Sequence, residues 1–138
     1  MKYICDTNFI AQYLLKDNQE MFDKTKIIFD KVKTGHITLI IEQTVFMEVI
    51  YLLSSFYKIP RKEISLTLSE MFNYKGIKCK KECFLTALEY YTKYNIHIVD
   101  CILLAEATLE NIPICTFDQK LLKLVSEYGI SIKKKLSI

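Results

Sequence analysis

The sequence has few of the residues that interrupt helices and strands. Its 138 residues include no Trp, three Gly and two Pro, which leaves little room for long flexible linkers. No apolar run approaches the eighteen or so residues of a membrane helix. The first acid, at position 6, comes too early for a secretory signal peptide. We therefore expect a single domain over residues 1–138, in the cytoplasm and without a membrane attachment.

Histidine is also scarce, and the cysteines do not form a metal pattern. Two His argue against a histidine-based metal site. Of the five Cys, Cys79 and Cys83 have three residues between them and no His nearby, a poor zinc spacing. The other three lie in apolar segments and should be buried thiols in a reducing compartment: Cys5, Cys101 and Cys115.

The positive charge of the chain is nearly all lysine. Arg61 is the single arginine among 19 basic residues, and the formal net charge is +3. Lysines cluster at 75–81 and 133–135. A solvated surface is the plain interpretation of each cluster. Attraction of phosphate groups is the alternative, and it requires a functional site nearby.

Apolar periodicity predicts strands that alternate with helices. The predicted strands are 2–5, 36–41, 77–79, 112–117 and 130–134, and the predicted helices are 7–15, 19–33, 44–57, 61–72, 80–94, one opening near 100, and 119–128. This alternation is typical of an α/β fold around a central, mainly parallel sheet, here of four to five strands. In such folds the ligand site lies beyond the carboxyl ends of the strands.

Three aspartates stand out because each follows an apolar run and precedes a predicted helix: Asp6, Asp100 and Asp118. An aspartate in that place often caps the helix, so three N-caps are one interpretation. Glu48 cannot be a cap, because it lies in mid-helix between Met47 and Val49 with no Lys or Arg within one turn. A glutamate on so apolar a helix needs solvent access or a cation.

A shared divalent cation would account for all four acids. Four carboxylates that converge at the carboxyl end of a sheet would repel one another. Mg²⁺ or Mn²⁺ resolves that conflict, because hard cations prefer oxygen ligands. Such ions commonly act on phosphates, where they activate water and stabilise charge. The acids therefore indicate a nuclease.

Four segments carry a resemblance to a known family: "ICDTNFIAQYLL", "TVFMEVIYLLSSFYKIPRKEI", "DCILLAEA" and "PICTFDQKL". Over residues 2 to about 125 the sequence resembles the PIN-domain family, and within it the VapC-type ribonuclease toxins. The resemblance implies a three-layer α/β/α sandwich with a central sheet. It also implies Mg²⁺- or Mn²⁺-dependent cleavage of single-stranded RNA.

The resemblance also implies roles for individual residues. The catalytic acids would be Asp6, Glu48, Asp100 and Asp118, and the metal ligands would be Asp6, Asp100 and Asp118. Small polar residues beside the site would orient carboxylates or water, although a cap or turn role is the alternative: Thr7, Asn8 and Thr116. Lys120 would contact an RNA phosphate or belong to a solvated helix face. Phe9 and Tyr13 would stack bases or belong to the core.

The chain departs from the family pattern after the fourth acid. Many relatives have another acid or an asparagine there, whereas this chain has Gln119 and Lys120, which leaves a second metal position open. Glu42 follows a predicted strand, but a surface acid near a helix start is its plainer interpretation. Glu106 lies six residues after Asp100, about 240° around a helix, so we expect it to face away from the site.

A VapC-type toxin would have a cognate antitoxin protein and would often form a homodimer. Two other functions remain open at this point: a housekeeping RNA-processing PIN nuclease, and a catalytically silent PIN module that binds RNA or a partner. A phosphatase of the haloacid-dehalogenase type would need an aspartate where Asn8 stands, so we do not favour it.

Overall fold

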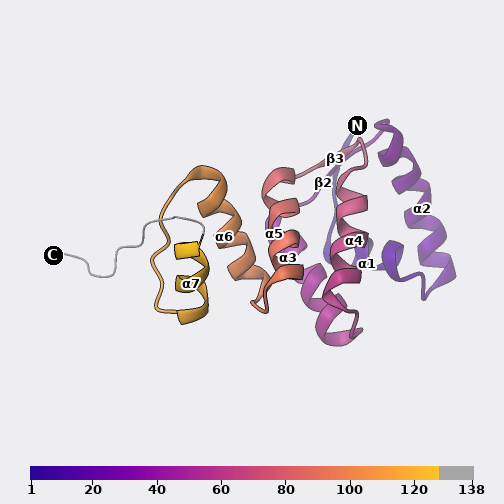
Figure 1. Cartoon of the computed structure of the whole chain (residues 1–138). Helices are drawn as coiled ribbons and strands as arrows, with labels where there is room; N and C mark the ends of the chain where they lie inside the picture. Colours follow the sequence, from indigo (N-terminus) through magenta and orange to yellow (C-terminus); the bar gives the residue numbers. More distant parts are fainter. Residues whose placement is uncertain (128–138) are drawn as a thin grey trace. The chain divides into compact units, whose positions relative to one another are not determined.

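The computed structural model describes residues 1–127, and Figure 1 shows the order of its elements. The elements are β1 (Lys2–Ile4), α1 (Thr7–Leu15), α2 (Gln19–Thr34), β2 (Thr38–Ile40), α3 (Gln43–Tyr51), the π-helix η1 (Leu52–Phe56), α4 (Arg61–Phe72), β3 (Ile77–Lys78), α5 (Lys81–Lys93), α6 (Ile98–Glu110) and α7 (Gln119–Glu127). The predicted strand at 130–134 and the lysines at 133–135 lie outside the described residues. The chain divides into two compact units, residues 1–81 and the part from Glu82 onward. The single domain predicted over residues 1–138 stays a prediction.

The first unit contains a parallel sheet with the strand order β1-β2-β3. Tyr3 pairs with Leu39, and Leu39 pairs with Ile77. The pairing continues past the strand ends, since Cys5 N–H donates to Ile40 O at 3.4 Å and Ile41 N–H donates to Lys78 O at 2.9 Å. Because the strands are parallel, their carboxyl ends share one edge of the sheet. The residues that follow β1 and β2 therefore lie at that edge.

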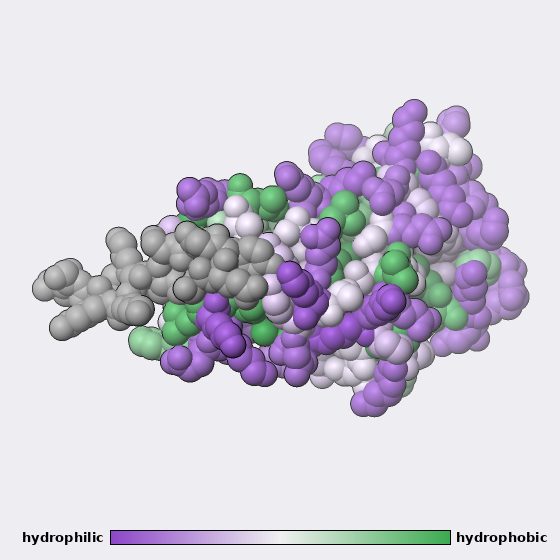
Figure 2. Space-filling view, viewed as in Figure 1, coloured by the Kyte–Doolittle hydropathy of each residue, from purple (hydrophilic) through white to green (hydrophobic). Residues whose placement is uncertain are grey.

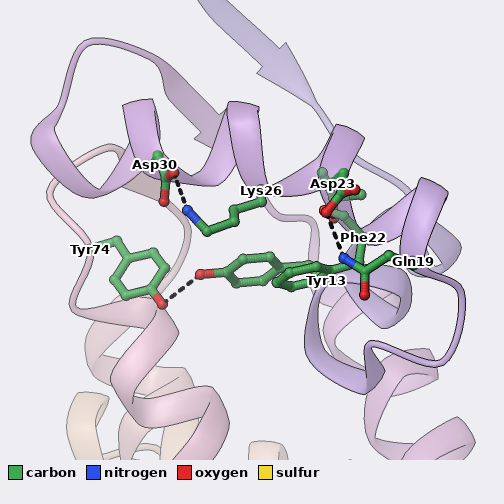
Figure 3. A network of polar contacts seen from close by, with 8 residues as sticks. Tyr13, Gln19, Phe22, Asp23, Lys26, Asp30 and Tyr74 are labelled. Atoms are coloured by element: carbon green, nitrogen blue, oxygen red, sulfur yellow. Dashed lines mark hydrogen bonds and ion pairs between the residues drawn. The ribbon is translucent and has the colours of Figure 1, made fainter.

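Helix α1 packs against α2 and α3 in this unit (Figure 1). The Tyr13 ring of α1 stacks on Phe29 of α2 with 3.9 Å between ring centroids. Its hydroxyl lies 3.0 Å from that of Tyr74, which joins α1 to the segment before β3 (Figure 3). Tyr13 is buried, so its core role is confirmed and base stacking by Tyr13 is excluded.

The predicted helix at 44–57 is confirmed, but its second half is not a regular α-helix. α3 runs into η1, where Tyr57 N–H donates to Leu52 O, five residues back, at 3.2 Å. α4 follows after Pro60, which occupies the N-cap position. A proline there loses no helical hydrogen bond, because the first helical N–H groups have no partner inside the helix.

The second unit is helical within the described residues. Tyr90 O–H of α5 donates to Thr108 Oγ1 of α6 at 3.3 Å, and α6 also contacts α7. The inward residues of α5 and α6 are fully buried apolar side chains, including Phe84, Leu88, Ile102 and Leu104. No helix among residues 1–127 is both long and apolar enough to span a bilayer.

The predicted α/β class with a parallel sheet is confirmed, but the strand number is not. The sheet has three strands among residues 1–127, rather than four to five. Segment 112–117, predicted as a strand, has no regular structure, and Phe117 is 96% exposed. Apolar composition alone does not make a strand, because its N–H and C=O groups need a neighbouring strand. Cys115 in this segment is exposed, so its predicted burial is wrong, whereas that of Cys5 and Cys101 is confirmed.

Candidate active site

Asp6 lies two residues beyond the end of β1, at the carboxyl edge of the sheet, and is exposed. It is the N-cap of α1, where its Oδ1 accepts a hydrogen bond from Phe9 N–H at 2.9 Å. The cap interpretation of Asp6 is therefore confirmed. A carboxylate has about four lone-pair sites on two oxygens. No hydrogen bond from residues 1–127 to Oδ2 is seen, so this oxygen can bind a cation while Oδ1 holds the helix end.

A hollow of about 600 Å³ adjoins Asp6 in the first unit. Its wall is otherwise mostly apolar and comes from β1, α1, α2, β2 and α3: Tyr3, Ile4, Cys5, Phe9, Ile28, Leu39 and Val45. This hollow could not be predicted from the sequence, because the elements that form it are far apart in the chain. One side of Asp6 faces this hollow.

The cap at Asp6 leads to a prediction about stability. Asp6→Asn keeps a side-chain oxygen that can accept the Phe9 N–H bond, so we expect the free energy of unfolding to change by less than about 0.5 kcal/mol. Asp6→Ala removes the acceptor and should cost about 1 kcal/mol. Urea unfolding followed by circular dichroism measures both values. Equal losses in the two variants would contradict the cap.

Cys5 precedes Asp6, and its thiol is not available for chemistry. Burial, and secondarily the charge of Asp6, raise the pKa of the Cys5 thiol from 9.0 to about 12. Burial likewise raises the pKa of Cys79 to about 11. The folded state therefore holds these two protons more tightly than the unfolded state does. The contribution to the free energy of unfolding is complete below pH 9 and is lost as the pH rises toward the pKa values of the folded state.

We predict that iodoacetamide at pH 8 modifies the exposed Cys115 in the folded protein and leaves Cys5 unmodified. With a pKa of about 12, roughly one Cys5 thiol in ten thousand is ionised at pH 8, and only the thiolate reacts. Peptide mass spectrometry after a timed reaction gives the modified fraction at each cysteine, with urea-unfolded protein as the control. Equal labelling of Cys5 and Cys115 in the folded protein would show that Cys5 is not buried.

Thr7 and Asn8 open α1 beside Asp6. Thr7 is half-buried and Asn8 is exposed. Asn8 Oδ1 accepts a hydrogen bond from Gln12 Nε2 at 3.3 Å, one helical turn further on. This bond holds the Asn8 amide along the helix surface. A role for Thr7 or Asn8 in orienting carboxylates or water stays a prediction.

Glu48 lies within α3, and its side chain is exposed. A glutamate on so apolar a helix needs either solvent access or a cation, and Glu48 has solvent access. A cation is not needed to explain why a charged residue occurs in this helix. Glu42, at the N-cap of α3, is exposed and makes no side-chain cap bond, which agrees with its interpretation as a surface acid.

Asp100 lies in the first turn of α6, two residues after its first residue, Ile98. The cap interpretation is wrong for Asp100, because the N-cap is His97, which makes no side-chain cap bond. Asp100 is half-buried, and its neighbours Ile98 and Cys101 are buried. The positive end of the helix dipole favours a carboxylate in this turn. The helix dipole therefore offsets part of the free-energy cost of half-burying the Asp100 charge.

Asp118 caps α7. Its Oδ1 accepts a hydrogen bond from Leu121 N–H, and its own N–H donates to Thr116 Oγ1, both at 3.0 Å. The cap interpretation of Asp118 and the turn role of Thr116 are therefore confirmed. Asp118 and the following Lys120 are both exposed. Contact between Lys120 and RNA stays a prediction.

The four acids belong to different units. Asp6 and Glu48 lie in the first unit, and Asp100 and Asp118 lie in the second. Among residues 1–127 there is no group of three or more His, Cys, Asp or Glu side chains that could hold a metal ion, so neither unit forms such a site alone. The convergence of all four acids stays a prediction.

The family model of the PIN domain matches residues 3–127. The chain therefore belongs to the PIN domain family. Comparisons with curated proteins and with solved structures gave no match. PIN domains are commonly metal-dependent nucleases, which supports a nuclease role for this chain.

Proposed function

We propose that this protein is a Mg²⁺- or Mn²⁺-dependent endoribonuclease that cleaves single-stranded RNA, and that it acts in the cytoplasm as the toxin of a VapBC-type toxin–antitoxin pair. One observation carries the proposal. The PIN-domain match over residues 3–127 includes the four motif segments, and each of them contains one of the four acids. The nuclease is the broader part of the proposal, and the toxin role is the narrower part.

The donor set suits the proposed ion. Asp6, Asp100 and Asp118 would hold it, and all their donor atoms are carboxylate oxygens, which Mg²⁺ and Mn²⁺ prefer. The ion, when bound, would make a water more acidic and neutralise charge on the attacked phosphodiester. Glu48, whose side chain is exposed, would accept a proton or orient a water at the edge of the site.

Local hydrogen bonds support this role by fixing two of the carboxylates. Asp6 and Asp118 each use Oδ1 to cap a helix, which restricts the side chain to one orientation. A ligand that is held before the ion arrives loses less entropy when the ion binds. The helix caps and the metal ligands are therefore compatible roles for the same residues.

Metal removal tests the nuclease. A 20-nucleotide single-stranded RNA of mixed sequence, labelled at one end, is incubated with the full chain and Mg²⁺, Mn²⁺ or EDTA. We expect products with 5′-phosphate and 3′-hydroxyl ends in either metal and a loss of cleavage of at least about 1000-fold in EDTA, because a metal-assisted reaction loses its main source of charge stabilisation. Cleavage that continues in EDTA, or an absence of cleavage with both Mg²⁺ and Mn²⁺, would contradict the proposal.

The toxin role requires a partner, and we propose a cognate antitoxin and a homodimer. Exposed aromatic side chains on the α3–η1 segment, Tyr51 at 69% and Phe56 at 73%, offer apolar surface for such contacts. Expression in bacteria should stop growth, and co-expression of a neighbouring small reading frame should restore it. Growth that is unaffected by an active nuclease would favour a housekeeping role.

A further inference from the structure

Three lysines lie in segments that meet the end of the sheet opposite to Asp6. Lys31 and Lys33 lie in the last turn of α2, which leads into β2, and Lys75 precedes β3 by two residues. They therefore flank the amino ends of two parallel strands, whereas Asp6 follows the carboxyl end of β1. We call Lys31, Lys33 and Lys75 the basic edge.

Side-chain contacts bring the two segments of the basic edge together. A Cβ atom on Gly35 would lie 2.9 Å from Lys75 Cδ, so the Lys75 side chain crosses the end of α2. Lys33 Nζ lies 5.2 Å from the centroid of the Tyr74 ring. Burial, and then the hydrogen bond with Tyr13, raise the pKa of Tyr74 to about 12. Tyr74 is therefore a neutral ring beside a cation and does not cancel its charge.

The lysines of the basic edge differ from others on the same helix. Lys24 pairs with Glu20 at 3.3 Å, and Lys26 pairs with Asp30 at 2.6 Å. Within residues 1–127, none of the three basic-edge lysines forms an ion pair with a carboxylate. No ion pair in this part of the chain therefore neutralises the charge of the three lysines.

A second hollow adjoins Lys31 of the basic edge. It measures about 600 Å³ and is lined by Met1, Tyr3, Lys31, His36 and Ile37, so it combines a cation with an aromatic ring. Figure 2 shows mostly hydrophilic side chains over α2, which suits a charged rather than an apolar ligand. Lysines that act as separate point charges fit a chain of phosphates better than a flat apolar partner.

We propose that the basic edge binds the phosphate backbone of single-stranded RNA at a distance from the cleaved bond. The inference rests on the proposed nuclease function and adds a substrate contact to it. From Lys2 to Asp6 an extended chain spans about 13 Å at roughly 3.3 Å per residue, which is about four stacked nucleotides. An RNA strand of modest length therefore reaches from Asp6 to the basic edge. Such a contact positions the RNA without reading its sequence.

A binding experiment without metal tests this contact. The full chain is titrated against a 5′-fluorescein-labelled 12-nucleotide RNA in EDTA, and fluorescence anisotropy gives the Kd from 0.05 to 0.5 M salt. In the triple variant Lys31→Gln, Lys33→Gln, Lys75→Gln, we expect the slope of log K against log salt to fall by about 2, at roughly 0.7 per lost phosphate contact. The same term predicts about 100-fold weaker binding at 0.1 M salt. With Mg²⁺ present, KM should rise and kcat should not change.

The matched control is the triple variant Lys24→Gln, Lys26→Gln, Lys62→Gln, which removes the same charge from exposed positions elsewhere in the first unit. It should bind almost as tightly as the unmodified protein. Equal weakening in both triples, unchanged binding in the first, or no RNA binding by the unmodified protein would overturn the proposal.

Two further arms separate a failed contact from a failed fold or a failed nuclease. The triple Lys31→Arg, Lys33→Arg, Lys75→Arg keeps the charge and should keep the binding; loss of binding in this variant with an intact fold would contradict a backbone contact. If the lysines only complement the dipole of α2, the glutamine triple will change the unfolding midpoint and not the salt slope. If RNA binds but is never cleaved, the proposed nuclease activity is wrong, whereas the proposed contact at the basic edge is retained.

Discussion

Asp100→Asn is expected to lower kcat for Mg²⁺-dependent RNA cleavage by about 1000-fold, the size of effect that follows when one preorganised electrostatic contact is removed. Asparagine has nearly the same shape and suits the half-buried position in the first turn of α6. It lacks the negative charge that a divalent ion needs. Stability should fall by less than about 1 kcal/mol, the usual contribution of a charge near a helix end. Initial rates across a Mg²⁺ titration measure the effect.

Asp23→Asn is the matched control for Asp100→Asn. Asp23 is exposed in α2, where it accepts a hydrogen bond from Gln19 Nε2 at 2.7 Å (Figure 3). Asparagine keeps an acceptor for this bond, and its charge change is the same, so kcat should remain that of the unmodified protein. If Asp100→Asn retains more than about a tenth of the kcat of the unmodified protein, Asp100 is not a metal ligand.

Gly76→Ala is expected to destabilise the first unit by more than about 4 kcal/mol, a loss that only severe strain or core disruption produces. A Cβ atom at Gly76 would lie 2.0 Å from the carbonyl oxygen of Ile37 and 2.8 Å from that of Val32. Both are backbone atoms and cannot turn aside. Gly76 N–H also donates to Val32 O, and Gly76 O accepts from Leu39 N–H, both at 2.8 Å. Moving this residue would therefore break the entry into the sheet.

Gly35→Ala provides a comparison for Gly76→Ala. Gly35 has φ +85°, so alanine would be strained by about 1 kcal/mol. The atom nearest to its new Cβ belongs to the flexible Lys75 side chain, which can move. Urea unfolding of both variants should give a much larger loss for Gly76→Ala. A loss below about 1 kcal/mol for that variant would show that the 32–37 turn and Gly76 are not in contact.

The local parts of this fold could be predicted from the sequence. The helix beginning at Thr7 and the caps at Asp6 and Asp118 depend on residues within four positions of one another, and short-range patterns report such contacts well. The role of Gly76 could not be predicted in this way. It depends on a carbonyl 39 residues earlier in the chain, that of Ile37, which no local pattern reveals.

The candidate site shows the same division between local and long-range information. Motif context selected the four acids, and the PIN-domain match supports the nuclease class. Burial could not be predicted from neighbours in the sequence. Glu48 has apolar neighbours and yet is exposed, and segment 112–117 is apolar and yet forms no strand. Both results depend on which other elements cover a residue, and that is a property of the whole fold.

We propose that acids far apart in the chain share one divalent ion. A crystal structure of the full chain grown with Mn²⁺, with data collected at the manganese absorption edge, tests it directly. We expect an anomalous peak in contact with carboxylate oxygens of Asp6, Asp100 and Asp118, with Glu48 close by. Four carboxylates in separate solvent-filled places, with no shared peak, would contradict it.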